Sequence, residues 1–210
     1  MNRLNPRPTK REWLSTFFSA KREWLSTFFS AKDVFTVKNL CVMAMLLAVG
    51  VVMKAPVFNI YLTPNQKIIG FEFIPEIIVA YMFGPWGGMA YALALDTVGF
   101  LVFPQGAYFF GYAISEMLTL FIYALFVYKQ PLRLWKLVIA QAVVTLVVFY
   151  GTHFLWGVVL WGADTSFWLN TTKLVINLAT FPVIVLMKYF VVRELIPRVV
   201  LSPQRAAAGK

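Results

Sequence analysis

Residues 83–110 read FGPWGGMAYALALDTVGFLVFPQGAYFF. This stretch begins with a Gly-Pro turn, continues as an apolar segment that carries one acid, Asp96, and ends in a second turn, 104–107. Because proline cannot continue a helix and glycine favours its end, the two turns bound a single helix. An acid inside an apolar helix is costly in a bilayer unless it faces a protein cavity. The stretch therefore predicts a membrane helix with a close-packed turn at one end and the mouth of a binding site at the other.

The rest of the chain is similarly apolar. Of its 210 residues, 60% are hydrophobic and 13% are charged, and the mean hydropathy is +0.72. These values exclude an ordinary soluble domain and predict a polytopic membrane protein. A spanning helix takes about 20 residues, which leaves room for roughly six crossings. We therefore expect an all-α integral membrane protein that forms a six-helix bundle.

Turn signals divide the chain into segments. Four helices are expected at about 38–53, 71–83, 86–103 and 108–128. A basic connector, 129–136, leads to a fifth helix that reaches about 161, and a sixth is expected at about 167–192. Segment 54–70 carries two prolines and several polar residues, and is expected to be a long functional loop. The predicted parts are a cytoplasmic segment 1–37, a membrane domain 38–193 and a cytoplasmic tail 194–210.

The N-terminal segment contains the repeat KREWLSTFFSA, at 10–20 and again at 21–31. A period of eleven residues aligns the Trp and Phe side chains on one helical stripe, which suits a helix lying in the membrane interface. A tandem duplication in a tolerated tail explains the repeat equally well.

Lysine and arginine predict the orientation. Of the 19 such residues, eight lie at or before Lys38, three in 129–136 and five in 188–210, whereas only Lys54, Lys67 and Lys173 fall on the opposite side. By the positive-inside rule both termini are cytoplasmic. The net charge of +10 is therefore a topology signal and does not indicate a nucleic-acid partner.

Five charged or titratable residues lie inside predicted helices. At a rise of 1.5 Å per residue, each lies roughly 8–12 Å below the outer surface. A shared depth predicts a pocket that opens to the outside, although pairing of Asp96 with Lys173, or of Glu116 with His153, is an alternative without any ligand. The five are Glu76, Asp96, Glu116, His153 and Lys173.

Aromatic and amide residues flank this layer. They would supply walls and a rim suited to a flat, polar-edged organic ligand, although Trp and Tyr also gather at membrane interfaces without binding anything. The flanking residues are Phe71, Phe73, Gln105, Tyr108, Trp156, Trp161 and Asn170.

No catalytic pattern is present. There is no nucleotide-binding loop, and one His153 and one Cys41 leave too few ligands for a zinc cluster. Any ATP-driven transport would need another chain to bind the nucleotide. Two alternatives are a proton-coupled carrier that uses Glu76, Asp96 and Glu116 as a relay, and a structural membrane subunit.

The stretch 83–110 and its continuation resemble the substrate-binding (S) components of energy-coupling-factor (ECF) vitamin transporters, in the folate-type branch. The motifs are Gly84-Pro85, the step from Asp96 to Gly99, and FPQGAYF at 103–109. The resemblance implies a six-helix vitamin-binding subunit, without a cofactor of its own, in a bacterial plasma membrane. Its partners would be a transmembrane coupling subunit, docked through Ala44 and Ala48, and two ATPases that hold ATP and magnesium. Loops 54–70 and 104–107 would act as gates.

Folate or a related pterin is the ligand that the resemblance implies. The usual arginine of the last helix corresponds to Lys173, and the asparagine that follows it to Asn177. Because this chain adds Glu76 and Glu116, another vitamin or precursor such as cobalamin, pantothenate or a queuosine precursor stays open. The candidate ligand-binding residues are Phe71, Phe73, Glu76, Asp96, Gln105, Tyr108, Glu116, His153, Trp156, Asn170, Lys173 and Asn177.

Overall fold

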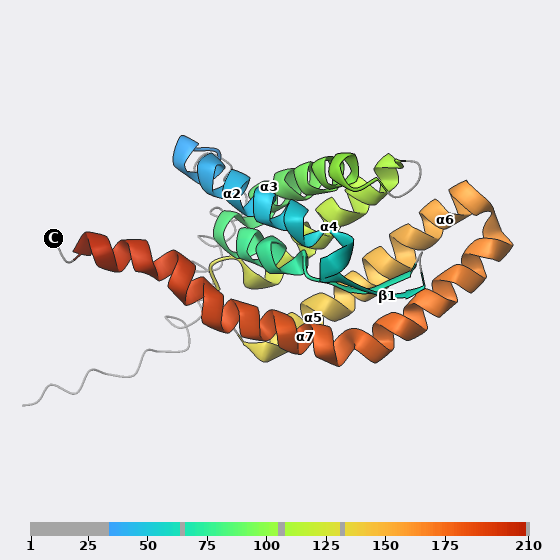
Figure 1. The fold of residues 1–210 in the computed structure, drawn as a ribbon. Helices are drawn as coiled ribbons and strands as arrows, with labels where there is room; N and C mark the ends of the chain where they lie inside the picture. Colours follow the sequence, from blue (N-terminus) through green and yellow to red (C-terminus); the bar gives the residue numbers. More distant parts are fainter. Residues whose placement is uncertain (1–33, 64–65, 105–107, 131–132, 209–210) are drawn as a thin grey trace, which may run out of the picture.

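The computed structural model describes residues 34–63, 66–104, 108–130 and 133–208 (Figure 1). The N-terminal repeat and Gln105 lie outside these ranges. The elements are α2 (Val37–Met53), η1 (Pro56–Phe58), β1 (Asn59–Thr63), β2 (Gln66–Gly70), α3 (Phe73–Val102), α4 (Phe110–Val127), α5 (Leu134–Val144), η2 (Thr145–Thr152), α6 (His153–Trp161) and α7 (Ala163–Ala208).

Four helical segments are long and apolar enough to cross a bilayer: Phe73–Val102, Phe110–Val127, Leu134–Trp161 and Thr171–Glu194. Helix α2 is apolar but shorter, with 17 residues. The prediction of a multi-pass helical membrane protein is therefore confirmed. The predicted number of six crossings is not confirmed, because the two helices predicted on either side of residue 84 form one element, α3.

Gly84 marks a sharp change of direction within α3. Its φ of 69° and ψ of −158° are non-helical and lie where only glycine is unstrained. Gly84, Pro85, Gly87 and Gly88 are all buried, and a Cβ at Gly84 would lie 3.0 Å from the ring of Tyr128. The predicted Gly-Pro turn is therefore close-packed against the end of α4, and it separates two helical halves of α3.

Segment 54–70 is not a loop. After the single turn η1, β1 and β2 form an antiparallel hairpin in which Asn59 pairs with Gly70 and Ile60 with Ile69. The β-branched and aromatic residues of this segment favour strands, and this preference outweighs its turn signals. The prediction of a loop is wrong here, whereas the described chain is otherwise helical, and the hairpin lies between the helices (Figure 1).

The last two predicted helices also differ from their expected form. The fifth consists of α5, the π-helical turn η2 and α6, and ends at Gly162, whose φ is 84°. Helix α7 then starts at once and returns alongside α6 (Figure 1). It runs 46 residues to Ala208, so the prediction that it ends near 192 is wrong. The apolar span ends at Glu194, and the helix continues beyond it through the segment that was predicted to be a tail.

Helix α2 packs in parallel against the second half of α3. The Tyr91 hydroxyl donates to the Leu46 carbonyl at 3.0 Å, and a Cβ at Gly50 would lie 2.5 Å from that hydroxyl. Two turns further on, Lys54 lies over Gly99. Leu46 and Lys54 are eight residues apart, as are their partners Tyr91 and Gly99, so the two helices run in the same direction.

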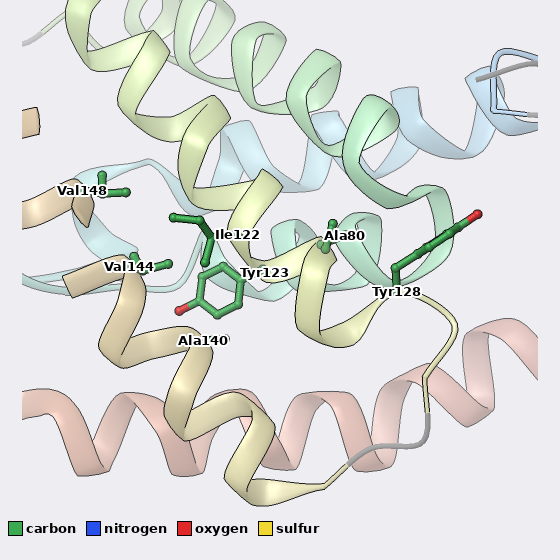
Figure 2. Close-up of a cluster of buried hydrophobic side chains, with 8 residues drawn as sticks. Ala80, Ile122, Tyr123, Tyr128, Ala140, Val144 and Val148 are labelled. Carbon is green, nitrogen blue, oxygen red and sulfur yellow. The ribbon is translucent and has the colours of Figure 1, made fainter. Parts of the chain in front are cut away.

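The central core joins α3, α4, α5 and η2. Figure 2 shows Tyr123 of α4 beside Ile122, with Ala140 and Val144 of α5 close to its ring. This cluster fixes the rotation of α4 and α5, and so decides which of their polar side chains face α7.

Candidate functional site

A cavity of about 330 Å³ lies between the hairpin, the first half of α3, α4, α5 to α6, and α7. Its volume is within the range of small-molecule sites. The lining residues are Ile69, Gly70, Glu72, Phe73, Glu76, Glu116, Thr119, Gln141, Val144, Phe149, His153, Lys173, Ile176, Asn177, Ile184 and Lys188.

Helix α7 forms one long side of the cavity. Lys173, Asn177, Ile184 and Lys188 are spaced so that they share one helical face. Lys173 and Lys188 are separated by about 22 Å along a helix of this rise. The cavity is therefore elongated, with a cation near each end.

Lys188 is buried at the inner end, with 8% of its surface exposed. Its ammonium donates to the Tyr123 hydroxyl at 2.6 Å and to Gln141 Oε1 at 2.9 Å, and lies 5.7 Å from the ring centre of Phe73. The Tyr123 hydroxyl in turn donates to Gln141 Oε1. An ammonium has three donors, so two are held by α4 and α5.

Three carboxylates line the same cavity, those of Glu72, Glu76 and Glu116. Two lysines and three acids in a small space produce a strong electrostatic potential, whose sign changes from one part of the cavity to another. The cavity therefore offers both donors and acceptors to a ligand.

Aromatic rings form the wall near His153. The imidazole lies 5.2 Å from the ring centre of Phe149 and 5.5 Å from that of Tyr112, edge to face in both cases. These contacts orient the imidazole ring. In the part of the chain that the structure describes, no group of three or more His, Cys, Asp or Glu side chains is placed to hold a metal ion.

The comparison with known families matches residues 38–201 to the ECF transporter substrate-specific component. The chain belongs to this family. The folate transporter FolT of Clostridium novyi (strain NT) is 31% identical over 129 residues, which cover 60% of this chain and 74% of that protein. The FolT of Leuconostoc mesenteroides subsp. mesenteroides is 26% identical over 164 residues, covering 75% and 85%. A crystal structure of FolT bound with folic acid superposes with a TM-score of 0.64 at 32% identity, covering 75% of this chain and 92% of that one.

In this S component, four members of the predicted polar layer come together. Glu76, Glu116, His153 and Lys173 all line the cavity, as do Phe73 and Asn177 from the other predicted site residues. Phe71 lies next to them, with its ring stacked on that of Phe73 at 6.3 Å.

Asp96 is not among the lining residues of this S component. Its carboxylate lies 3.5 Å from the ammonium of Lys54 at the end of α2, and not beside Lys173. A count of depth along a helix does not give the rotation of the helix, and Asp96 faces α2.

Two predicted rim aromatics make contacts of their own. Trp156 donates to Ser115 Oγ at 3.0 Å and packs against Phe109, which ties α6 to α4. Tyr108 is 40% exposed and packs against Phe100. Trp161 is exposed at the end of α6, and the side chain of Asn170 lies outside the described part.

Lys188, Gln141, Thr119 and Glu72 were missed by sequence reasoning. Lys188 is one of the sixteen basic residues on which the predicted orientation rests, but it lies in the cavity, so fifteen of 19 remain in support of that prediction. The signal was present, because Lys188 lies on the helical face of Lys173 and Asn177.

Proposed function

We propose that this S component captures folate from outside the cell, in the cavity along α7, for an ATP-driven ECF importer. The observation that carries the proposal is the 32% identity and TM-score of 0.64 to FolT bound with folic acid. The chemistry of the cavity agrees with it, since an elongated site with a cation near each end suits a long anionic ligand with a flat polar head.

The recognition chemistry follows from the lining. Lys173 pairs with a carboxylate of the glutamate tail, and Asn177 supports it one turn away. Phe73 and Phe149 stack on the pterin or on the benzoyl ring. Glu76 and Glu116 accept from the amino and ring N–H groups of the pterin, while Lys188 donates to its carbonyl oxygen. Asp96 does not line the cavity and does not contact the ligand in this arrangement.

We propose that the chain crosses a bacterial plasma membrane six times, with both termini in the cytoplasm. The two halves of α3 would be the second and third crossings, joined at Gly84. The parallel packing of α2 on the second half of α3 supports this, because the first and third crossings of an alternating chain run in the same direction. The positive-inside count still favours cytoplasmic termini.

The transport cycle requires other subunits. Ala44 and Ala48 are exposed on α2, where small residues let another helix approach closely. They are the proposed docking surface for the ECF coupling subunit, and two ATPases would hold ATP and magnesium. The hairpin contributes Ile69 and Gly70 to the cavity and would act as the gate.

The test is mass spectrometry of the small molecule that copurifies with the chain, followed by uptake in vesicles. A folate in the purified protein, with uptake only when the coupling subunit and ATPases are present, is the expected result. A different vitamin would overturn the folate assignment. Proton-driven uptake by the chain alone would overturn the importer.

A further inference from the structure

The ion pair between Lys54 and Asp96 lies at the point where α2 ends. Lys54 is the C-cap of α2, and its side chain and that of Asp96 are only 21% and 16% exposed. Poorly hydrated partners of this kind are stable only while they stay together, because either one alone keeps the cost of desolvation. The pair therefore holds the end of α2 against α3.

Gly99 completes the seat for Lys54. It lies three residues after Asp96, on a neighbouring position of the same helix face. A Cβ at Gly99 would lie 2.5 Å from Cδ of Lys54. Asp96 thus receives the ammonium, while Gly99 leaves room for the aliphatic stem. The Asp-x-x-Gly step is a socket for one lysine.

The same helix end carries the hairpin. The side-chain amide of Asn59 donates to the carbonyl oxygens of Met53, Lys54 and Ala55, at 3.4, 3.0 and 2.8 Å. The carbonyls of Met53 and Lys54 lie at the end of α2, where a helix leaves carbonyls without an intrahelical donor, whereas that of Ala55 also accepts from the Phe58 N–H. Asn59 is also the first residue of β1, so it ties the start of the hairpin to the end of α2.

The hairpin root reaches the cavity wall. Asn59 pairs with Gly70, the last residue of β2, and a Cβ at Gly70 would lie 2.6 Å from Asn59 Oδ1. Gly70 itself lines the cavity, as does Ile69 before it. A continuous set of contacts therefore leads from Asp96 through Lys54 and Asn59 to the wall of the site.

We propose that the Lys54–Asp96 ion pair is a strut that fixes the root of the β1–β2 hairpin and thereby sets how long a ligand stays in the cavity. Asp96 is a positioning residue that acts through Lys54. The part that concerns a ligand rests on the proposed function, whereas the restraint on the hairpin does not.

Hydrogen exchange of the ligand-free protein tests the restraint. The variants are Lys54→Met, Asp96→Asn, the double variant, which leaves no unpaired charge, and Gly99→Ala, which fills the socket. Amides of the two hairpin strands, 59–63 and 66–70, should exchange about tenfold faster in the two single charge variants and in Gly99→Ala, as expected for the loss of one charge-assisted contact. Gly88→Ala is the control, because its Cβ would make an ordinary 3.4 Å contact with Leu120. Unchanged exchange of the hairpin in the three single variants would overturn the proposal.

Stopped-flow folate binding tests the consequence for the ligand. Each single charge variant should release folate about tenfold faster with an association rate within about twofold of wild type, because the hairpin contact is lost and not a ligand contact. The double variant should be no worse than the worse single variant, since both residues act through one contact. Additive losses would show that Asp96 acts on the ligand independently of Lys54, and would overturn the strut. If the wild-type protein binds no folate, the proposed function fails, while the exchange experiment still decides the restraint.

Discussion

The ammonium of Lys188 lies 2.6 Å from the hydroxyl of Tyr123, so helix α7 places a cation against α4 at the inner end of the cavity. Gln141 of α5 accepts from both groups. Helix α7 thus meets the consecutive helices α4 and α5 at one polar point inside an apolar bundle.

Removal of the Lys188 ammonium should weaken folate binding more than it weakens the fold. In Lys188→Met, Tyr123 and Gln141 keep their bond to each other, whereas the ligand loses a charged donor, which is typically worth about 1.5–3 kcal/mol. We expect an increase in the folate dissociation constant of about 10- to 100-fold by titration calorimetry. Lys129→Met, at an exposed residue outside the cavity, is the matched control. Equal loss in both variants would show that Lys188 does not face the ligand.

Lys173→Met should separate ligands with a glutamate tail from those without one. If Lys173 pairs with a carboxylate, folate should bind about tenfold or more weakly to the variant, whereas pteroic acid, which lacks the glutamate, should bind as before. Lys173→Arg keeps the charge and should retain folate. An equal loss of affinity for folate and pteroic acid would show that Lys173 contacts a part of the ligand other than the glutamate. Competition assays with tritiated folate measure both ligands on both variants.

Gly84→Ala should destabilise the bundle. At a φ of 69° and a ψ of −158°, alanine is strained by roughly 1–3 kcal/mol, and its Cβ would press on the ring of Tyr128. A lower midpoint of thermal unfolding, followed by fluorescence of the purified protein, is the expected result. Gly151→Ala is the control, since its Cβ would meet only the Leu146 carbonyl oxygen, at 3.6 Å. If Gly84→Ala and Gly151→Ala unfold at the same temperature, position 84 does not require glycine, and the kink at this residue is contradicted.

Ser115→Ala should change stability without changing affinity. Ser115 is fully buried, accepts from Trp156 and lies 3.0 Å from Thr152 Oγ1, but it does not line the cavity. Its loss leaves the Trp156 N–H without this acceptor, at a cost of about 1–3 kcal/mol. We expect a lower unfolding midpoint and a shifted tryptophan emission, with folate affinity within about twofold of wild type. A much larger change in affinity would show that the contact between α4 and α6 shapes the site.

The sequence predicts the membrane class and part of the site because both depend on local quantities. Long apolar segments indicate helices that cross a bilayer, and the fixed rise of a helix gives the depth of a polar residue. Glu76, Glu116, His153 and Lys173 were placed at one depth by this count, and the structure brings them to one cavity.

The errors come from quantities that depend on tertiary packing. Asp96 faces Lys54 and does not line the cavity, because the rotation of α3 is set by its contacts with α2. Lys188 lies near the end of an apolar segment, where a lysine ordinarily reaches the water. The hairpin at 59–70 was missed because its strands are short and pair only with each other inside the bundle.

Capture of folate by this chain is tested most directly by titration calorimetry of folate into the purified protein, without ATP and without any partner subunit. We expect saturable binding of one folate per chain, weakened in Lys173→Met and Lys188→Met. An absence of binding to protein from which any copurified ligand has been removed would contradict it, as would binding that neither substitution weakens.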